Sequence, residues 1–191
     1  MEYTGSVFIC RGGEMANTLG LGPSARKGLW VQVPPSAFSM HYTTQSEQTT
    51  RSLARKFARQ LRGGDVVLLQ GELGTGKTTF VKGLAAAFGI KEKIKSPTFV
   101  LIHVHRIVHR RQFTVHSTLK YFVHCDAYRV KIPHELMKAG LLDWLGRPDT
   151  VVVIEWGEKM KPLIKGNRVW IIRCRHGRRT NERVIRIFKP R

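Results

Sequence analysis

The chain has 191 residues, of which 42% are hydrophobic, and this is enough for one well-packed domain of ordinary size. Its apolar runs are strand-sized and shorter than the roughly 18 residues that a membrane-spanning helix needs, and Cys10, Cys125 and Cys174 form no CxxC pair. These features exclude a membrane span and argue against a disulfide framework or a zinc finger, so we expect a cytoplasmic protein.

The formal net charge is +20. Clustered Lys and Arg attract polyanions through their field and through the release of counterions, so RNA is one expected partner. A solvated basic surface without such a partner explains the same charge, because net charge informs about association rather than fold. Both interpretations stay open at this point.

Residues 1–39 are rich in glycine, contain the pair Pro34-Pro35 and show no sustained helical or strand periodicity. We therefore expect a poorly structured N-terminal extension, followed by one domain over residues 40–191. Met40 stands directly before the first periodic segment, so translation could also start there.

The first periodic segment predicts an amphipathic helix. Thr44 and Glu47 have the spacing of a capping box, apolar residues then repeat every four positions up to Leu61, and Gly63-Gly64 ends the run. The apolar segment 65–70 that follows predicts a buried strand, and residues 77–88 predict a second helix that stops at Gly89.

The rest of the chain alternates further strands with one more helix. The predicted helix lies near residues 133–145, and the predicted strands are 99–104, 119–125, 151–154, 169–174 and 184–188. This order predicts a single α/β domain with a mixed β-sheet flanked by helices.

The loop between strand 65–70 and helix 77–88 carries the strongest motif. Gly71, Gly76, Lys77 and Thr78 match GxxxxGK[ST], in which backbone N–H groups curl round the phosphates of a nucleotide and the helix offers its positive end. Lys77 would bridge the β- and γ-phosphates and Thr78 would bind Mg²⁺. We therefore expect ATP and Mg²⁺ as ligands.

An ATPase of this kind also needs a carboxylate near the metal, at the end of a neighbouring buried strand. Glu155 ends the apolar run 151–154 and is our candidate metal ligand, together with Thr78. Asp126 ends the segment 119–125 in the same way and would orient the attacking water.

A third polar segment lies after the second helix. In Ser96-Pro97-Thr98 the proline stiffens a turn, and the hydroxyls of Ser96 and Thr98 could reach the γ-phosphate as a switch does. A plain Ser-Pro turn explains these residues equally simply.

The segments GELGTGKTTFVKGL, KSPTFVLI, HCDAYR and VVVIEWGEK occur in this order and spacing, and together they resemble the TsaE (YjeE) family over roughly residues 43–189. The resemblance implies a P-loop NTPase-like fold and a Mg²⁺-dependent ATPase that is slow alone. It also implies TsaD and TsaB as partners, with which the family makes threonylcarbamoyladenosine on tRNA beside the anticodon. In that machinery this component does not perform the transfer itself.

The resemblance also assigns roles to individual residues. Lys77, Asp126 and Glu155 would be catalytic, and Trp156 would pack beside Glu155. Glu47 would contact the adenine side, whereas Glu158, Gly177 and Arg178 would close over the nucleotide. The phosphates would be held by the loop and the start of the following helix, over Leu73, Gly74, Thr75, Gly76, Lys77, Thr78 and Thr79.

Two other function classes compete with an ATPase. In a P-loop kinase, Asp126 would be the base for a substrate hydroxyl, but no acceptor signature is present and Arg178-Arg179 are the obvious lid candidates. A non-catalytic RNA-binding module would explain the charge but leaves the acids at the strand ends unexplained.

The connection between residues 104 and 120 is unusually basic for the family pattern. His103, His105, His109 and His116 suggest a metal site, but no paired Cys or carboxylate supports it, and solvated histidines are the simpler interpretation. The arginines of the connection could contact tRNA phosphates or an acidic partner, or could simply face water; they are Arg106, Arg110 and Arg111.

Overall fold

The computed structural model describes residues 39–92, 94, 101–108, 118–164 and 167–190. The predicted extension lies outside them except for Ser39, so its character stays a prediction. Within the described ranges, no helix has both the length and the apolar content to cross a bilayer.

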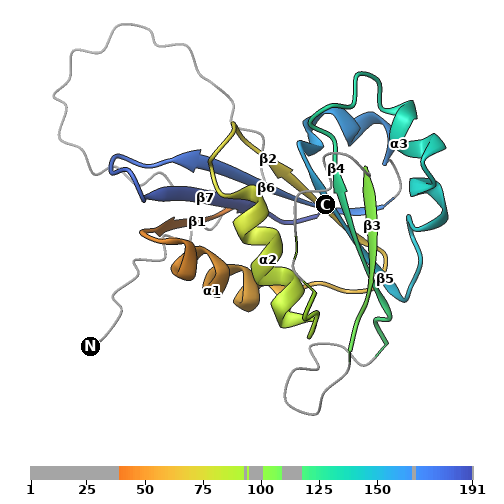
Figure 1. The fold of residues 1–191 in the computed structure, drawn as a ribbon, viewed down its shortest axis with the longest axis horizontal. Helices are drawn as coiled ribbons and strands as arrows, with labels where there is room; N and C mark the ends of the chain where they lie inside the picture. Colours follow the sequence, from red (N-terminus) through yellow and green to blue (C-terminus); the bar gives the residue numbers. More distant parts are fainter. Residues whose placement is uncertain (1–38, 93, 95–100, 109–117, 165–166, 191) are drawn as a thin grey trace, which may run out of the picture.

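The elements form one α/β domain (Figure 1), as the sequence predicted. The strands are β1 (Ser39–Thr44), β2 (Asp65–Gln70), β3 (Ile102–Arg106), β4 (Tyr121–Asp126), β5 (Thr150–Glu155), β6 (Arg168–His176) and β7 (Arg183–Phe188). The helices are α1 (Glu47–Ala58), α2 (Lys77–Ala87) and α3 (His134–Lys138), with the 3₁₀ segments η1 (Leu141–Asp143) and η2 (Gly157–Leu163).

All described strands belong to one mixed sheet in the order β1-β7-β6-β2-β5-β4-β3. The central strands β6, β2, β5 and β4 are parallel neighbours, whereas β3, β7 and β1 pair antiparallel at the two sides. The carboxyl ends of β2, β5 and β4 therefore meet at one edge, where open α/β sheets bind their ligands.

Two hydrophobic cores cover the two faces of the sheet. On one face α1 and α2 pack over β6, β2, β5 and β4 and bury Phe57, Phe80 and Trp170. On the other face α3, η1 and η2 cover β2, β4 and β5 and bury Leu136 and Met160. Because β2 and β5 are buried on both faces, they read as continuous apolar runs in the sequence.

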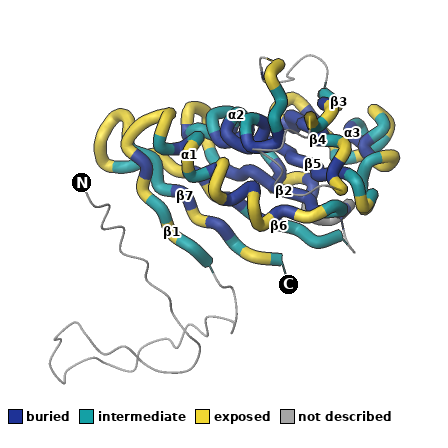
Figure 2. The backbone as a smooth tube through the Cα atoms, turned by 90° about the horizontal axis from the view of Figure 1, so that it is seen from below, coloured by how far each residue is buried: buried dark blue, intermediate teal, exposed yellow. Residues whose placement is uncertain are grey.

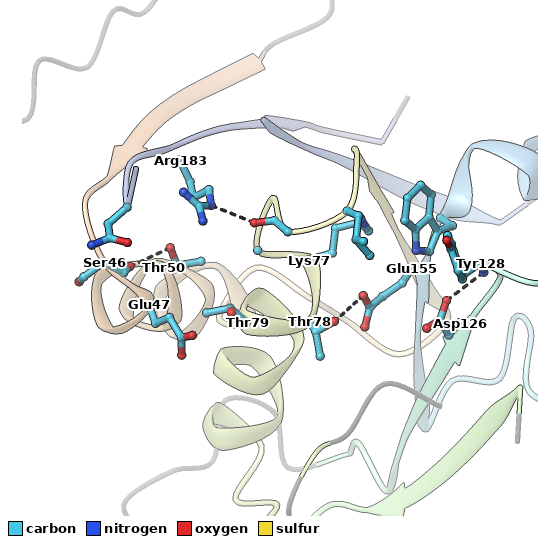
Figure 3. A pocket seen from close by; sticks show the side chains of 15 residues that line it. Ser46, Glu47, Thr50, Lys77, Thr78, Thr79, Asp126, Tyr128, Glu155 and Arg183 are labelled. Carbon is cyan, nitrogen blue, oxygen red and sulfur yellow. Dashed lines mark hydrogen bonds between the residues drawn. The ribbon is translucent and has the colours of Figure 1, made fainter. Parts of the chain in front are cut away.

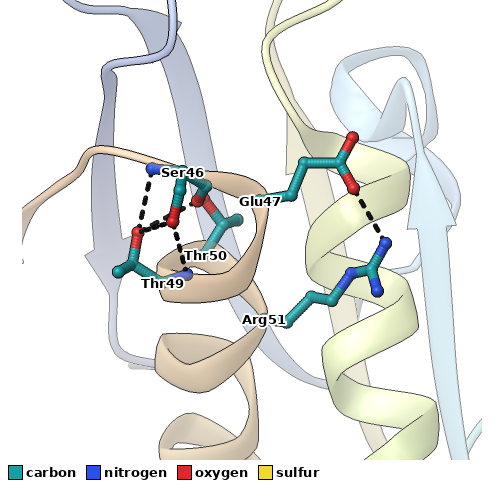
Figure 4. Close-up of polar contacts among 5 residues, drawn as sticks. All are labelled: Ser46, Glu47, Thr49, Thr50 and Arg51. Atoms are coloured by element: carbon teal, nitrogen blue, oxygen red, sulfur yellow. Dashed lines mark hydrogen bonds and ion pairs between the residues drawn. The ribbon is translucent and has the colours of Figure 1, made fainter.

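The predicted start of the first helix is wrong by a few residues. Thr44 is the last residue of β1, and its hydroxyl lies 2.7 Å from the Thr50 hydroxyl. The capping box is instead made by Ser46, whose Oγ accepts the Thr49 amide at 3.1 Å, and by Thr49, whose Oγ1 accepts the Ser46 amide at 3.0 Å (Figure 4). Glu47 is thereby the first residue of α1 and not the closing residue of its cap.

The structure differs from the prediction in three further elements. The helix predicted near residues 133–145 is interrupted at Gly140, whose φ of 96° is left-handed, so a short α3 is followed by η1. Strand β1 was not predicted, because its six residues mix partly buried and exposed side chains and depend on pairing with β7. Of the predicted strand 99–104, residues 102–104 belong to β3, which continues to Arg106, and residues 99 and 100 lie outside the described residues.

Candidate functional site

The glycine loop lies between β2 and α2, in the context that the motif requires. Gly71 has φ 135°, and a Cβ there would collide with the Cys174 carbonyl oxygen of β6. Gly76 has φ 93° and is the residue from which α2 starts. These backbone conformations strongly favour glycine, and they turn the chain so that the N-terminus of α2 faces the cleft.

Lys77 lies at the centre of the loop. Its ammonium donates hydrogen bonds of 2.7 Å to the carbonyls of both Gly71 and Glu72, and it lies 3.8 Å from the centre of the Trp156 ring. Burial lowers the pKa of Lys77, although the nearby carboxylate of Glu155 opposes this shift. The side chain is thus held by neutral groups that phosphate oxygens would outcompete as partners.

Glu155 connects the loop to the neighbouring strands. Its Oε2 accepts a 2.7 Å hydrogen bond from the Thr78 hydroxyl, and its Oε1 lies 2.9 Å from Nε2 of His124 (Figure 3 shows the Thr78 contact). Glu155 and His124 are almost fully buried. Since a carboxylate only accepts, Nε2 of His124 donates, and the imidazole fixes the orientation of the carboxylate.

The Glu155 carboxylate and the Thr78 hydroxyl are suitable ligands for Mg²⁺. They bring two oxygen ligands, one of them from an acidic side chain, to the edge of the loop that faces the cleft. Mg²⁺ prefers oxygen ligands and commonly takes few from the protein, with water and substrate phosphates supplying the rest. Asp126 is the last residue of β4 and lies in register with Glu155, and its Oδ1 accepts a hydrogen bond from the Tyr128 amide at 2.9 Å.

Trp156 adopts a backbone conformation that is unusual for its residue type. Its φ of 57° and ψ of 37° lie in the left-handed region, which carries strain for a residue other than glycine. This turn places the indole ring beside the Lys77 ammonium and 5.0 Å from the centre of the Tyr128 ring. Strain of this kind is often found where a side chain must be held at a functional site.

These elements enclose a cleft of about 520 Å³ at the carboxyl edge of the sheet. Its lining residues come from α1, the glycine loop, the ends of β4 and β5, and the β6–β7 hairpin (Figure 3): Ser46, Glu47, Thr50, Leu73, Gly74, Gly76, Lys77, Thr78, Thr79, Asp126, Tyr128, Glu155, Trp156, Asn181 and Arg183. The structure thus brings together most of the candidate residues from distant parts of the chain.

The remaining candidates lie elsewhere. Thr75 is buried beneath the loop, where its hydroxyl donates to the Glu72 carbonyl at 2.8 Å. Glu158, Gly177 and Arg178 do not line the cleft, and the Arg178 amide instead donates to Glu182 within the β6–β7 hairpin. Ser96 and Thr98 lie outside the described residues.

Sequence reasoning missed several residues of the cleft. Asn181 and Arg183 come from the same hairpin as Gly177 and Arg178, and Arg183 donates to the Gly74 carbonyl at 3.2 Å. The register of the hairpin decides which of its side chains face the loop. Ser46 and Thr50 carry no motif of their own, whereas Tyr128 belongs to the quoted segment HCDAYR without being singled out. The same holds for His124, which contacts Glu155 but does not line the cleft.

The histidine-rich connection shows no metal site in its described part. In the described ranges, no three His, Cys, Asp or Glu side chains gather as a metal site would need. His105 instead lies 2.6 Å from the carboxylate of Glu92. His109 and His116, with Arg110 and Arg111, lie outside the described residues.

Comparison with known proteins decides the family. The family model described as "Threonylcarbamoyl adenosine biosynthesis protein TsaE" matches residues 44–185, which include every residue that lines the cleft. The chain belongs to the TsaE family. The resemblance found in the sequence motifs is thereby confirmed.

Several proteins named "tRNA threonylcarbamoyladenosine biosynthesis protein TsaE" are similar to this TsaE-family chain. The one from Streptomyces coelicolor is 41% identical over 108 residues, covering 56% of this chain and 67% of its own. The one from Rickettsia bellii is 38% identical over 120 residues, covering 62% and 75%. The one from Mycobacterium bovis is 41% identical over 115 residues, covering 58% and 64%.

A solved structure shares the fold. The crystal structure of YdiB from Bacillus subtilis superposes with a TM-score of 0.60 and covers 82% of this chain and 88% of its own, at 24% sequence identity. The similarity spans most of both chains, so an experimentally determined protein shares this α/β fold.

Proposed function

We propose that this protein binds and hydrolyses ATP as a component of the cytoplasmic machinery that installs threonylcarbamoyladenosine on tRNA next to the anticodon. It acts on a complex of TsaD and TsaB and does not perform the transfer itself. The TsaE-family membership supports the pathway, and the geometry of the cleft supports the ATPase step.

One observation carries the proposal. The loop lysine, the first hydroxyl of α2 and the acid at the end of β5 converge in one cleft, with Thr78 bonded to Glu155 at 2.7 Å. A cation, a hydroxyl and a carboxylate in this arrangement are the parts that phosphoryl transfer to water requires. An ordinary glycine turn would give no reason for a buried acid 77 positions away to meet it.

Each residue has a distinct task in this proposal. Lys77 leaves the Gly71 and Glu72 carbonyls and binds the β- and γ-phosphates, and the amides of the glycine loop hold the same oxygens. Thr78 and Glu155 would hold Mg²⁺, which when bound neutralises charge on the phosphates. Asp126 accepts a hydrogen bond from the attacking water and orients it.

The far end of the cleft would receive the nucleoside. Glu47 and Ser46 lie at the start of α1, and Glu47 also forms an exposed ion pair of 2.8 Å with Arg51 (Figure 4).

Arg183 reaches the loop from the β6–β7 hairpin and places a guanidinium within the lining of the same cleft. We expect Arg183 to contact a phosphate, because its fork of donors matches phosphate oxygens.

Phosphate release without any acceptor tests the activity. Purified protein with ATP and Mg²⁺ should release phosphate slowly, and added TsaD and TsaB should increase the rate. Lys77→Ala should abolish turnover, whereas Lys82→Ala, a lysine of the same helix outside the cleft lining, should not. Release that requires an added hydroxyl acceptor would instead identify a kinase.

A further inference from the structure

Part of the sheet has an exposed basic face. In β6 and β7, Trp170, Ile172, Cys174, Ile185 and Ile187 point into the core under α1 and α2. Strand residues alternate between faces, so the residues between them point the other way. On that side α3, η1 and η2 cover β2, β4 and β5, and Figure 2 shows β1, β7 and β6 at the side of the sheet away from α3.

We call this surface the basic sheet face and define it by His41 of β1, Arg173 and Arg175 of β6, Arg186 of β7, and the half-buried Ile171 and Phe188. The three arginines and His41 are exposed. None of the alternate positions of β1, β6 and β7 that point to this side is acidic.

The strand register concentrates the charge in one row. Arg173 pairs with Arg186, and Arg186 pairs with His41 on the next strand. Like charges directly opposite each other on neighbouring strands destabilise a sheet. Arg173 is also held in place, since its Nε donates to Gln70 at 3.2 Å and its guanidinium lies 4.9 Å from the Phe188 ring centre.

Protection of a sheet edge does not explain this row. Charged residues on edge strands prevent edge-to-edge aggregation, and His41 on β1 could serve in that way. Arg173, however, lies where β6 is paired on both sides, with Arg186 of β7 and with Gln70 of β2. The strand has no free edge to protect at this position, so the exposed Arg173 at the centre of the row needs another reason.

The basic sheet face leads to a second hollow beside the glycine loop. This hollow has a volume of about 420 Å³, and Arg173, Arg175 and His176 line it together with Gly71 and the acidic Glu72. Gly71 and Glu72 supply the carbonyls that hold Lys77. The basic surface therefore extends to the two residues of the glycine loop whose carbonyls hold Lys77.

We propose that the basic sheet face binds the phosphate backbone of tRNA. This inference rests on the proposed function, because that function makes tRNA the polyanion of the pathway. The planar guanidinium of arginine can donate two hydrogen bonds to a phosphate. Several arginines on a rigid sheet can therefore position an RNA through its backbone, without sequence-specific contacts. The overall charge of +20 has the sign that this partner requires.

The test compares two variants of the full chain that each remove three positive charges. The face variant carries Arg173→Gln, Arg175→Gln and Arg186→Gln. The control carries Arg55→Gln, Lys56→Gln and Arg59→Gln, which are exposed residues at the end of α1. Binding of an unmodified tRNA transcript is measured by fluorescence anisotropy at several salt concentrations.

The face variant should bind tRNA at least tenfold more weakly than the control. Affinity for tRNA falls as salt rises, and the plot of log affinity against log salt should be less steep for the face variant. The magnitude of its slope should decrease by about one for each phosphate that the variant no longer neutralises, and hence by about two to three. Both variants should keep wild-type affinity for a fluorescent ATP analogue, which separates this inference from the ATPase proposal and confirms that both are folded.

Three outcomes would overturn the inference. Equal loss of tRNA affinity in both variants would mean that the charge acts diffusely. Tighter binding of the wild type to polyglutamate than to tRNA would assign the face to an acidic protein. Self-association that the face variant alone loses would assign it to a second copy of the chain.

Discussion

His124 offers a sharp test of how the site is built. His124→Leu removes the imidazole that bonds Glu155 Oε1 at 2.9 Å and leaves a buried carboxylate oxygen without this partner. Outer partners of metal ligands typically contribute about 10- to 100-fold to metal affinity. We therefore expect the Mg²⁺ concentration for half-maximal ATPase activity to rise about 10- to 100-fold.

The same change should lower the free energy of unfolding. A buried group that loses a hydrogen-bond partner costs about 1–3 kcal/mol. Urea denaturation without nucleotide measures this term, and an Mg²⁺ titration of nucleotide binding measures the metal term separately. Binding of the nucleotide in the absence of Mg²⁺ should change little, because His124 does not line the cleft.

His124→Gln is the matched control, since its side-chain amide can donate to Glu155 from a similar position. This variant should recover most of the Mg²⁺ affinity. An unchanged Mg²⁺ requirement in His124→Leu, or an equal loss in both variants, would refute the claim that the imidazole positions the carboxylate.

Three further predictions concern packing, charge and thiols. Gly83→Ala should lower the free energy of unfolding by about 1–3 kcal/mol, because the new methyl group would meet the Ala54 Cβ at 2.6 Å; an unchanged urea midpoint would contradict this. Because burial lowers the pKa of Lys77, the ammonium should lose its proton at a pH below the ordinary lysine pKa of 10.5, and ATP affinity should fall as the pH rises through this range. The free-energy cost of burying the charged ammonium should disappear over the same pH range. Lys77→Arg should show no such pH dependence in any residual ATP binding. Burial raises the pKa of Cys174 to about 12 and that of Cys125 as well, so a Cys10→Ser protein should react with a thiol reagent only after unfolding, and fast reaction of the folded protein would argue against this packing.

The parts of the fold with a strong local signal could be predicted from the sequence. Strands β2 and β5 are buried on both faces, so their apolar runs predict them directly. The glycine loop is fixed by a backbone that strongly favours glycine at Gly71 and Gly76. Glu155 follows from the rule that parallel strands deliver their carboxyl ends to one edge.

Other features depend on contacts between distant segments. Strand β1 is stabilised by pairing with β7. This pairing holds Thr44 in a strand, so the N-cap of α1 is Ser46 and not the predicted Thr44. Which hairpin residue faces the loop depends on the β6–β7 register, and this selects Arg183 instead of Arg178. No periodicity within a single segment contains this information.

Multiple-turnover formation of threonylcarbamoyladenosine tests whether the cleft acts in tRNA modification. Purified TsaD and TsaB are supplied with tRNA, ATP and the other substrates, with either the wild-type protein or Glu155→Gln added. The wild type should sustain repeated turnovers, and Glu155→Gln, although still able to bind the nucleotide, should not. Equal product formation with both proteins, or with neither added, would contradict this role of the cleft.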